Sequence, residues 1–497
     1  MNEIMFIAYP DATIYRDNPE KQVKKKVAKK VLWGDWVRIP KPEDVSKNYI
    51  KVHCRGADGY IEKSKLQDER ILEVNFMDVG QGDGTFIVVP DKAKPDKDRF
   101  LLIDAGIGDN MHQFLDWRFN LRNNDFKVPI EYAFITHPDA DHYLGFSQLF
   151  DNPRYTFGKI YHNGVMPRNG NPKLGKTIKS GKKKYLLDIV DTDAKLMALI
   201  ASQKTLKPND YLSVLKSTKS VPKKPIPTEM AEKGIAIPGY TKGDFRIEVL
   251  GPIPETLPGG QKVLPVFGGD GPTKNGNSIA LMLIYKNVKV FMSGDLNKNS
   301  QKYIADRLVK EVDMSKERGE SAPELKTRKL RSVIGCDVAK ANHHGSRDFL
   351  YEFFTYLNPA ATVISSGDNE SFTHPRPDTI GVIGKTSRGE RPLIFSTELA
   401  RSAYNRLDFT EKKAAEIVDL KNKLDKETNK GLKASLKTQL EEKVAKYQRT
   451  IAVYGMITLR SDGEKVIIAQ KKEKKNSGFE IFRLEPDKTG TLVFVSK

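Results

Sequence analysis

The run THPDADHYLG, residues 136–145, constrains this chain more than any other feature, because it places four potential metal ligands within six residues: His137, Asp139, Asp141 and His142. An apolar strand pattern, YAFI, leads directly into it. Pro138 favours extended backbone at His137, so His137 and Asp139 should project to one side as the strand ends. Asp141 and His142 follow at the turn and should face a neighbouring position. The run therefore favours two adjacent metal sites, the alternative being a polar loop with a capping Asp before a helix.

Other candidate ligands also follow apolar strands. Asp295 ends VKVFMSGDL, where a carboxylate can bridge two cations; its alternative role is to cap a helix that starts near Asn297. His343 and His344, in AKANHHGSRDF, follow another apolar segment, and we expect one of them to bind metal. Nitrogen and oxygen ligands of this kind suit zinc or manganese.

The histidines are concentrated at such positions. Six of the eight, including His162 in KIYHNG and His374 in SFTHPRPD, come just after apolar strands, whereas His53 and His112 do not. A single histidine is more often a surface or core residue than a ligand. The concentration, taken together with Asp295, favours a dinuclear hydrolase.

These motifs resemble the metallo-β-lactamase superfamily and, within it, the hydrolase domain of ComEC-like DNA-uptake proteins. The resemblance covers about residues 71–385 and is carried, in order, by FMDVGQGDG, LLIDAG, THPDADHYLG, GNSIALMLIYKNVKVFMSGDL, AKANHHGS and SSGDNESFTHPRPD. It implies an α/β fold, a four-layer αβ/βα sandwich with two metal ions in the cleft between its sheets.

The resemblance also implies roles for single residues. Transferred by position, His137 and Asp139 bind the first metal, Asp141, His142 and His344 bind the second, Asp295 bridges them, and His343 lies beside the scissile phosphate. Asp83 and Asp104 match positions that orient histidines by accepting the other ring proton, with turn capping as the alternative.

The sequence departs from the family pattern in two places. Asp139 stands where many members carry histidine, which favours manganese more than an all-histidine site would. The usual histidine between the HxDxDH run and the bridging Asp is not clearly marked. Either His162 fills that place or the first metal is weakly held.

Three regions are expected along the chain. Residues 1–70 predict a small β-barrel that resembles the bacterial Src-homology-3-like type, and residues 71–400 the hydrolase domain with a basic insertion at 163–244. Residues 401–497 predict a helical hairpin, with an apolar stripe and a break at Gly431, followed by C-terminal strands that form a small β-unit. Further local predictions are a helix at DAKLMALIASQ and two β-hairpins, one turning at Lys286 and Asn287 and one in YGMITLRSDGEKVIIAQ.

Charge and cysteine content bear on partners and compartment. The chain has 83 Lys and Arg against 64 Asp and Glu, a net charge of +19, which favours nucleic acid through counterion release; a basic surface that serves solubility is the alternative. The two cysteines, Cys54 and Cys336, lie far apart without CxxC spacing and indicate neither a disulfide framework nor a thiolate metal site. Without a signal peptide or a membrane span, we expect a cytoplasmic protein. The barrel or the helical hairpin is the expected docking point for a protein partner or a second copy.

The combined expectation is a metal-dependent phosphodiesterase or nuclease in which Asp141, His343 and His374 act directly in catalysis. A small-molecule or cyclic-nucleotide phosphodiesterase is the alternative within the same chemistry. A non-catalytic binding scaffold is the alternative from another class.

Overall fold

A computed structural model of the chain describes residues 3–496 except 42, 81, 92–96, 221–224, 367–371, 398–406 and 473–477. Side chains are described for all of these except residues 407–414 and 445–454. The expected domain boundary at 400/401, and Lys223 and Lys224 of the basic insertion, lie outside the described residues.

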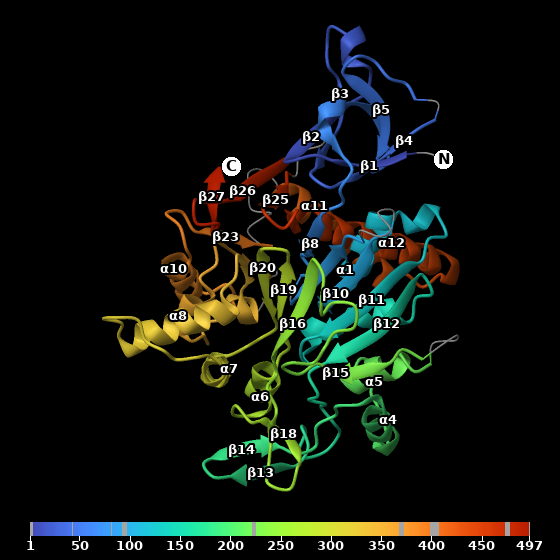
Figure 1. The fold of residues 1–497 in the computed structure, drawn as a ribbon. Helices are drawn as coiled ribbons and strands as arrows, with labels where there is room; N and C mark the ends of the chain where they lie inside the picture. The colour runs from blue at the N-terminus through green and yellow to red at the C-terminus, as the bar shows by residue number, and fades with distance from the viewer. Residues whose placement is uncertain are drawn as a thin grey trace.

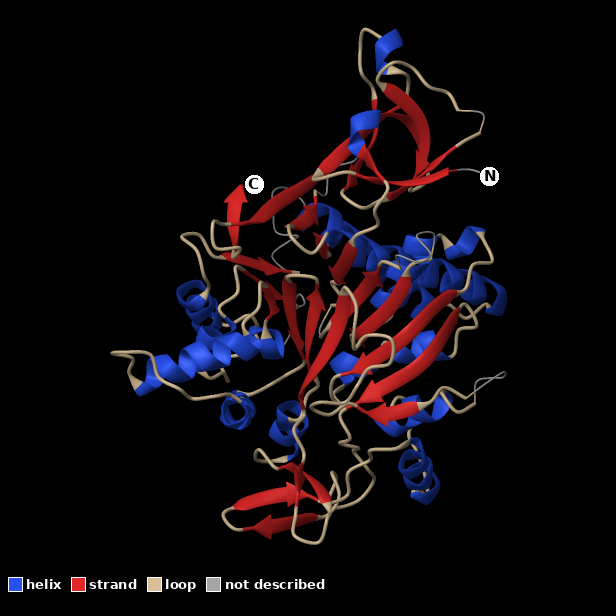
Figure 2. Cartoon of the chain, in the orientation of Figure 1, coloured by secondary structure: helices blue, strands red, loops and turns tan. Residues whose placement is uncertain are grey.

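Two large sheets form the centre of the molecule (Figures 1 and 2). The first has the order β15 (Thr228–Met230), β12 (Tyr155–His162), β11 (Val128–Ile135), β10 (Arg99–Ala105), β9 (Gly84–Val89), β8 (Leu72–Phe76), β24 (Ile457–Ser461), β25 (Val466–Lys471), β26 (Phe479–Pro486) and β27 (Leu492–Ser496). The second has the order β16 (Phe245–Gly251), β19 (Ala280–Tyr285), β20 (Val288–Ser293), β21 (Val338–Lys340), β22 (Ala361–Ile364) and β23 (Leu393–Ser396).

The sheets pack face to face over one apolar core. Side chains such as Phe76 and Phe134 of the first sheet and Leu281 and Met292 of the second belong to this core and are buried. Their strands are apolar at nearly every position because both faces of each sheet are covered.

Helices cover the outer faces of both sheets. The first sheet is covered by α1 (Asn110–Phe119), α2 (Ala140–Tyr143), α3 (Phe146–Phe150), α4 (Asp193–Ser202) and α5 (Tyr211–Ser217). The second is covered by α7 (Lys298–Leu308), α8 (Ala322–Ile334), α9 (Tyr351–Leu357) and α10 (Pro377–Thr386). The resulting order of helix, sheet, sheet and helix agrees with a mixed α/β sandwich of the kind that the resemblance implies.

Parallel pairing determines where the loops meet. β10, β11, β12 and β15 run parallel in the first sheet, and β20, β21, β22 and β23 run parallel in the second. The residues that follow β11, β20 and β21 therefore gather at the same end of the sandwich, which is where open α/β sheets bind ligands.

The C-terminal strands belong to the first sheet. β24 pairs antiparallel with β8, with Ile457 opposite Phe76, and β25, β26 and β27 extend the sheet from there. Residues 457–496 thus share a sheet with the strands that carry the site, instead of forming the separate β-unit expected from the sequence.

Several local predictions are confirmed. β19 and β20 form the hairpin that turns at Lys286 and Asn287, β24 and β25 form the second hairpin, and α4 matches the expected helix. The helical hairpin consists of α11 (Leu407–Lys426) and α12 (Lys430–Tyr454). Its break lies before Gly431, at Asn429, whose side chain accepts from the amides of Gly431 and Leu432.

The predicted stripe of that hairpin is only partly covered. Leu420 is 8% exposed, but Leu432 is 53% exposed. α12 packs against α1, on the helical side of the first sheet. No described helix of the chain is long and apolar enough to cross a bilayer.

Residues 3–67 form a separate antiparallel sheet at one end of the molecule (Figure 1). Its order is β3 (Val27–Leu32), β2 (Asp11–Tyr15), β6 (Ala57–Glu62), β5 (Tyr49–Cys54), β4 (Trp36–Ile39), β1 (Glu3–Ile7) and β7 (Leu66–Gln67). The sheet encloses a small core of its own, which includes Ile14 and Val52. A Src-homology-3-like barrel stays a prediction for this region.

A buried charge network joins this N-terminal sheet to the first large sheet. Arg460 on β24 lies 3.0 Å from Asp35 and 3.3 Å from Glu73 on β8, and these three side chains are all at most 2% exposed. Arg70 and Arg118 also pair with Glu73. Removing one member of such a buried network leaves an uncompensated charge.

We therefore expect Arg460→Met to lower the free energy of unfolding by about 3–5 kcal/mol, because Asp35 and Glu73 lose a buried partner. Urea denaturation followed by circular dichroism measures the change. Lys423→Met, at an exposed ion pair with Asp419, is the control and should change the value by less than about 0.5 kcal/mol. Equal effects of the two substitutions would contradict the structural role of the network.

Candidate metal centre

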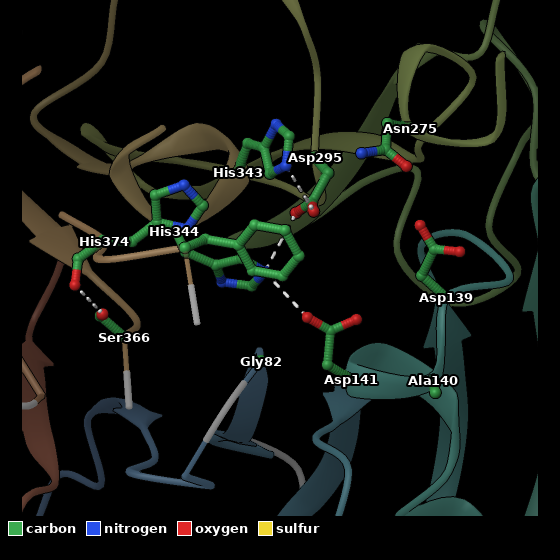
Figure 3. A pocket seen from close by; sticks show the side chains of 11 residues that line it. Gly82, Asp139, Ala140, Asp141, Asn275, Asp295, His343, His344, Ser366 and His374 are labelled. Carbon is green, nitrogen blue, oxygen red and sulfur yellow. Dashed lines mark hydrogen bonds and ion pairs between the residues drawn. The ribbon is translucent and has the colours of Figure 1, made fainter. Parts of the chain in front are cut away.

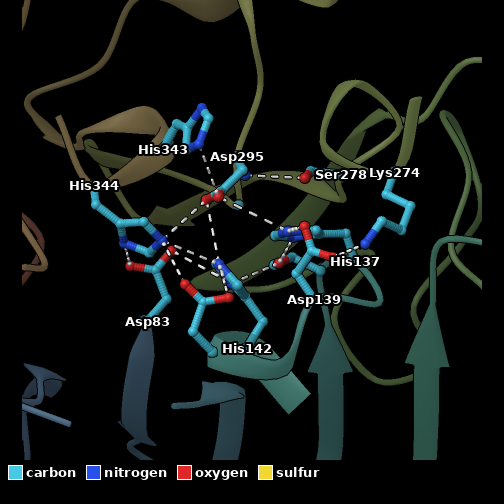
Figure 4. Close-up of polar contacts among 12 residues, drawn as sticks. Asp83, His137, Asp139, His142, Lys274, Ser278, Asp295, His343 and His344 are labelled. Carbon is cyan, nitrogen blue, oxygen red and sulfur yellow. Dashed lines mark hydrogen bonds and ion pairs between the residues drawn. The ribbon is translucent and has the colours of Figure 1, made fainter. Parts of the chain in front are cut away.

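Four segments bring histidine and aspartate side chains together at the end of the sandwich (Figure 4). His137, Asp139, Asp141 and His142 follow β11, Asp295 follows β20, and His343 and His344 follow β21. Asp83 comes from the loop before β9. The structure thus gathers nearly all of the residues that the sequence singled out, from both large sheets.

Asp295 lies between two groups of imidazoles, and each of its oxygens faces one group. Oδ1 is 3.3 Å from His142 Nε2 and 3.5 Å from His344 Nε2. Oδ2 is 3.8 Å from His137 Nε2 and 3.5 Å from His343 Nε2. This is the placement that a bridging carboxylate requires, since it offers one oxygen to each of two neighbouring positions.

The remaining aspartates of the run divide between the same two positions. Asp139 Oδ2 is 3.4 Å from His137 Nε2, whereas Asp141 Oδ2 is 3.5 Å from His344 Nε2. One position is therefore surrounded by His137, Asp139 and Asp295, and the other by Asp141, His142, His344 and Asp295.

The donor set fits a divalent cation. One ligand atom each from Asp83, His142, Asp295 and His344 lies within 4.8 Å of the others, and all four residues are buried. Among the described residues, His137 Nε2 and Asp295 Oδ1 are buried without a hydrogen-bond partner. Buried polar atoms are normally satisfied, and a cation bound by nitrogen and oxygen atoms would satisfy both.

The electric field of the cluster favours positive charge among the rings. Burial alone would lower the pKa of His142, but the carboxylates of Asp295, Asp104 and Asp141 outweigh it and raise that pKa well above its usual range. Burial opposes ionisation of Asp295 as well, yet the surrounding histidines hold its pKa well below its usual range. A cation at the centre would take the place of protons on the rings.

Two further aspartates lie beside the Nδ1 atoms of His142 and His344. His142 Nδ1 is 2.9 Å from Asp104 Oδ2, to which it can donate, and Asp104 also accepts from the amide and hydroxyl of Thr136. His344 Nδ1 is 3.2 Å from the carbonyl oxygen of Ser365, to which it can donate, and 3.4 Å from Asp83 Oδ1. Because Asp104 and the Ser365 carbonyl engage the Nδ1 atoms, the Nε2 atoms of both rings are directed at Asp295.

Backbone geometry at the centre is unusual. His343 and His344 both have positive φ, 50° and 51°, and so has Asp104, with φ 55°. Residues other than glycine seldom adopt this region, and such conformations occur preferentially at functional sites. At Gly82, with φ 108°, a Cβ atom would lie 1.8 Å from the carbonyl oxygen of Asp141, so only glycine allows this loop to approach α2.

Two lysines complete the site, and sequence reasoning missed both. Lys340 is 2% exposed, forms an ion pair with Asp83, and donates to the carbonyl of Ser293 at 2.8 Å. Lys274, on α6 (Asp270–Gly276), forms an ion pair with Asp139. The available signal was a lysine ending the apolar strand β21; nothing in the sequence distinguished Lys274 from the other lysines.

His162 does not join the cluster. It ends β12, where Tyr161 enters the core between the sheets and Ile160 enters the core on the helical side, so the alternation of the strand directs His162 toward the helices. Its Nδ1 accepts from the amide of Gly164 at 3.1 Å. Burial, followed by the charge of Lys219, lowers its pKa to about 3. The described residues between the HxDxDH run and Asp295 thus supply no histidine to the first position.

Asp295 and Asp139 do not cap the helices that follow them. Asn297 caps α7, since its side chain accepts from the amide of Ser300. Asp139 precedes α2 without making a side-chain capping bond. The carboxylates of Asp139 and Asp295 are therefore directed at the cluster.

A cavity of about 360 Å³ opens onto the centre (Figure 3). Asp139, Asp141 and Asp295 line one part of it, and His343 and His374 line another. The His374 ring lies 5.7 Å from the His343 ring and stacks on Phe372. The backbone carbonyl of His374 accepts from Ser366 Oγ at 2.8 Å. His343 thus lies beside Asp295, whereas His374 lies across the cavity from Asp139 (Figure 3).

Comparisons with known proteins give one kind of match. No protein-family model matches the sequence, and no curated protein does. Solved structures do match, among them the crystal structure of Tm1679, a metal-dependent hydrolase of the β-lactamase superfamily. That structure is 12% identical, with a TM-score of 0.31, over 66% of this chain and 96% of its own.

We expect the purified protein to retain divalent metal and Asp295→Asn to lose most of it, because Asp295 contacts both groups of imidazoles. Metal content after gel filtration, measured by plasma mass spectrometry, tests this. His53→Asn, in the N-terminal sheet, is the control, and His162→Asn should also keep its metal. Undiminished metal in a folded Asp295→Asn variant would contradict the assignment.

Proposed function

We propose that this chain is a metal-dependent phosphodiesterase that hydrolyses nucleic acid at a dinuclear centre. The observation that carries the proposal is the position of Asp295, with one oxygen toward His142 and His344 and the other toward His137 and His343. A mononuclear site would need only one of these groups.

The charge balance favours two cations over one. The five carboxylates of the centre oppose two ammonium groups, which leaves three negative charges when the histidines are neutral: Asp83, Asp104, Asp139, Asp141 and Asp295 against Lys274 and Lys340. One divalent cation would leave the site negative and repel a phosphodiester. Two would make it positive and attract one.

Divalent cations held here would supply an activated water molecule at neutral pH and polarise a phosphoryl oxygen. The side chains of the chain then have separate tasks. Asp104 and the Ser365 carbonyl fix the ring orientations of His142 and His344, and Asp83 adds a charge beside His344. His343, beside Asp295, and His374, across the cavity from Asp139, would stabilise the developing negative charge or give a proton to the leaving oxygen.

The nucleic-acid substrate is supported by the net charge of +19, since a basic protein gains affinity for a polyanion by releasing its counterions. Manganese is favoured over zinc because Asp139, Asp141 and Asp295 offer carboxylate oxygen at the two positions beside the imidazole nitrogens. Cytoplasmic action without a membrane is part of the same proposal.

Asp141→Ala should lower kcat for phosphodiester hydrolysis at least about 100-fold, because the variant loses a carboxylate directed at the His142 and His344 position. Assays with added manganese or zinc, on single-stranded and double-stranded DNA, RNA, cyclic nucleotides and bis(p-nitrophenyl) phosphate, measure the effect. Unchanged activity in Asp141→Ala would refute the metal assignment. Activity on cyclic nucleotides alone would replace nucleic acid by a small substrate, and retained metal without any hydrolysis would indicate a scaffold.

His374→Ala should lower kcat about 10²–10⁴-fold, the range for loss of a general acid or base, while metal content stays at the wild-type value. His112→Ala is the control, because His112 contacts Tyr155 outside the cavity. Single-turnover rates together with metal content distinguish a general acid or base from a metal ligand. Loss of metal in His374→Ala would instead make His374 a ligand.

A further inference from the structure

A hairpin rich in exposed lysine projects from the end of the molecule that carries the site. β13 (Thr177–Ser180) and β14 (Lys183–Leu186) form it, and they belong to a small sheet with β18 (Lys262–Pro265) and β17 (Glu255–Thr256). Figure 1 shows this sheet beyond α6, opposite the N-terminal sheet. Five lysines of the hairpin and the residue before it are exposed: Lys176, Lys179, Lys182, Lys183 and Lys184.

Two of these lysines face each other. In the register of the hairpin, Lys179 lies directly opposite Lys184. Like charges at directly opposed positions of an antiparallel pair are destabilising, by roughly 0.2–1 kcal/mol. An anion between or beside the two ammonium groups would relieve this repulsion.

Carboxylates of the protein do little to neutralise the hairpin. Lys183 lies 3.7 Å from Glu255. Across the described parts of the chain, no carboxylate comes within ion-pair distance of Lys179, Lys182 or Lys184. The positive charge of the hairpin therefore faces solvent.

The hairpin is attached firmly to the rim of the cavity. β14 pairs with β18, with Leu186 opposite Leu264, and both leucines are buried in a local core. The carbonyl of Pro265, which ends β18, accepts from Asn277 Nδ2 at 3.0 Å, at the end of α6. The same short helix carries Lys274, which pairs with Asp139, and Asn275, which lines the cavity.

We propose that the hairpin binds the phosphate backbone of a nucleic acid and guides it toward the cavity, an inference that rests on the proposed phosphodiesterase function. No residue of the hairpin is among those that line the cavity, so a small phosphodiester bound there should not contact these lysines. Long and short substrates should therefore respond differently to loss of its lysines. A bound phosphate should stabilise Lys179 and Lys184 most, because their like charges lie opposite each other in the hairpin.

The test compares the full-length wild type, Lys179→Gln/Lys184→Gln, and a control with the same charge change, Lys433→Gln/Lys437→Gln on the exposed face of α12. Fluorescence anisotropy with phosphorothioate oligonucleotides, which keep their backbone charge and resist hydrolysis, gives the affinity at several salt concentrations. Turnover of bis(p-nitrophenyl) phosphate with manganese reports on the metal centre. Thermal unfolding reports on the fold.

We expect the hairpin variant to bind roughly 10-fold more weakly and to lose about 1.5 from the slope of log K against log salt, since two phosphate contacts are removed. Its melting temperature should be equal or higher, and its turnover of the small substrate unchanged. A salt slope equal to that of the wild type, or an equal loss in the α12 control, would overturn the proposal. If the wild type hydrolyses neither bis(p-nitrophenyl) phosphate nor an unmodified oligonucleotide, the phosphodiesterase function fails, while the binding comparison still decides the role of the hairpin.

Discussion

The contact on which the rest of the site depends is that between Asp295 and the imidazoles on either side of it. This carboxylate is almost fully buried, with 3% of its residue surface exposed, and burying a charge is costly unless opposite charge or hydrogen bonds compensate. Its amide donates to Ser278 Oγ at 3.0 Å, which fixes the backbone, but its Oδ1 has no hydrogen-bond partner in the described chain. A cation bound at Oδ1 would supply the missing interaction.

The two-sheet architecture makes this contact possible. His137 and His142 follow a strand of the first sheet, whereas Asp295 and His344 follow strands of the second. The core between the sheets, where Phe134 and Tyr161 of the first sheet pack with Leu281 and Met292 of the second, sets the separation of the two halves of the centre. A packing defect in that core would shift one half of the centre relative to the other. Fold stability and metal affinity are coupled for this reason.

The sequence predicted the local part of the site well and its long-range part incompletely. Residues 137–142 and Asp295 could be recognised because each lies at the end of an apolar strand, a short-range pattern. Lys340 and Lys274 could not be assigned, since their partners Asp83 and Asp139 are distant in the sequence. His162 is a candidate ligand in the sequence because it ends a strand, but the face of the sheet that it occupies depends on the register of Tyr161 in the core.

The pairing of strands that are far apart in the sequence could not be predicted from local patterns either. Nothing near Ile457 indicates that this residue lies opposite Phe76, because strand partners are chosen by the hydrophobic faces of the assembled sheet. The strands of residues 457–496 could be predicted, but not the sheet to which they belong.

The lysines of the basic insertion differ in burial and pairing, which composition alone does not reveal. Residues 163–244 are uniformly rich in lysine, yet α4 and α5 bury Leu196, Ile200 and Leu215 against the first sheet, and β15 extends that sheet. Lys219 is 8% exposed and pairs with Asp193, so it is used inside the protein. Among the described residues of this region, the densest group of exposed lysines lies on and just before the hairpin of β13 and β14, where Lys179 and Lys184 oppose each other across the strands. An excess of lysine counted over the whole insertion overstates the charge available to a polyanion, because part of that charge is paired within the protein.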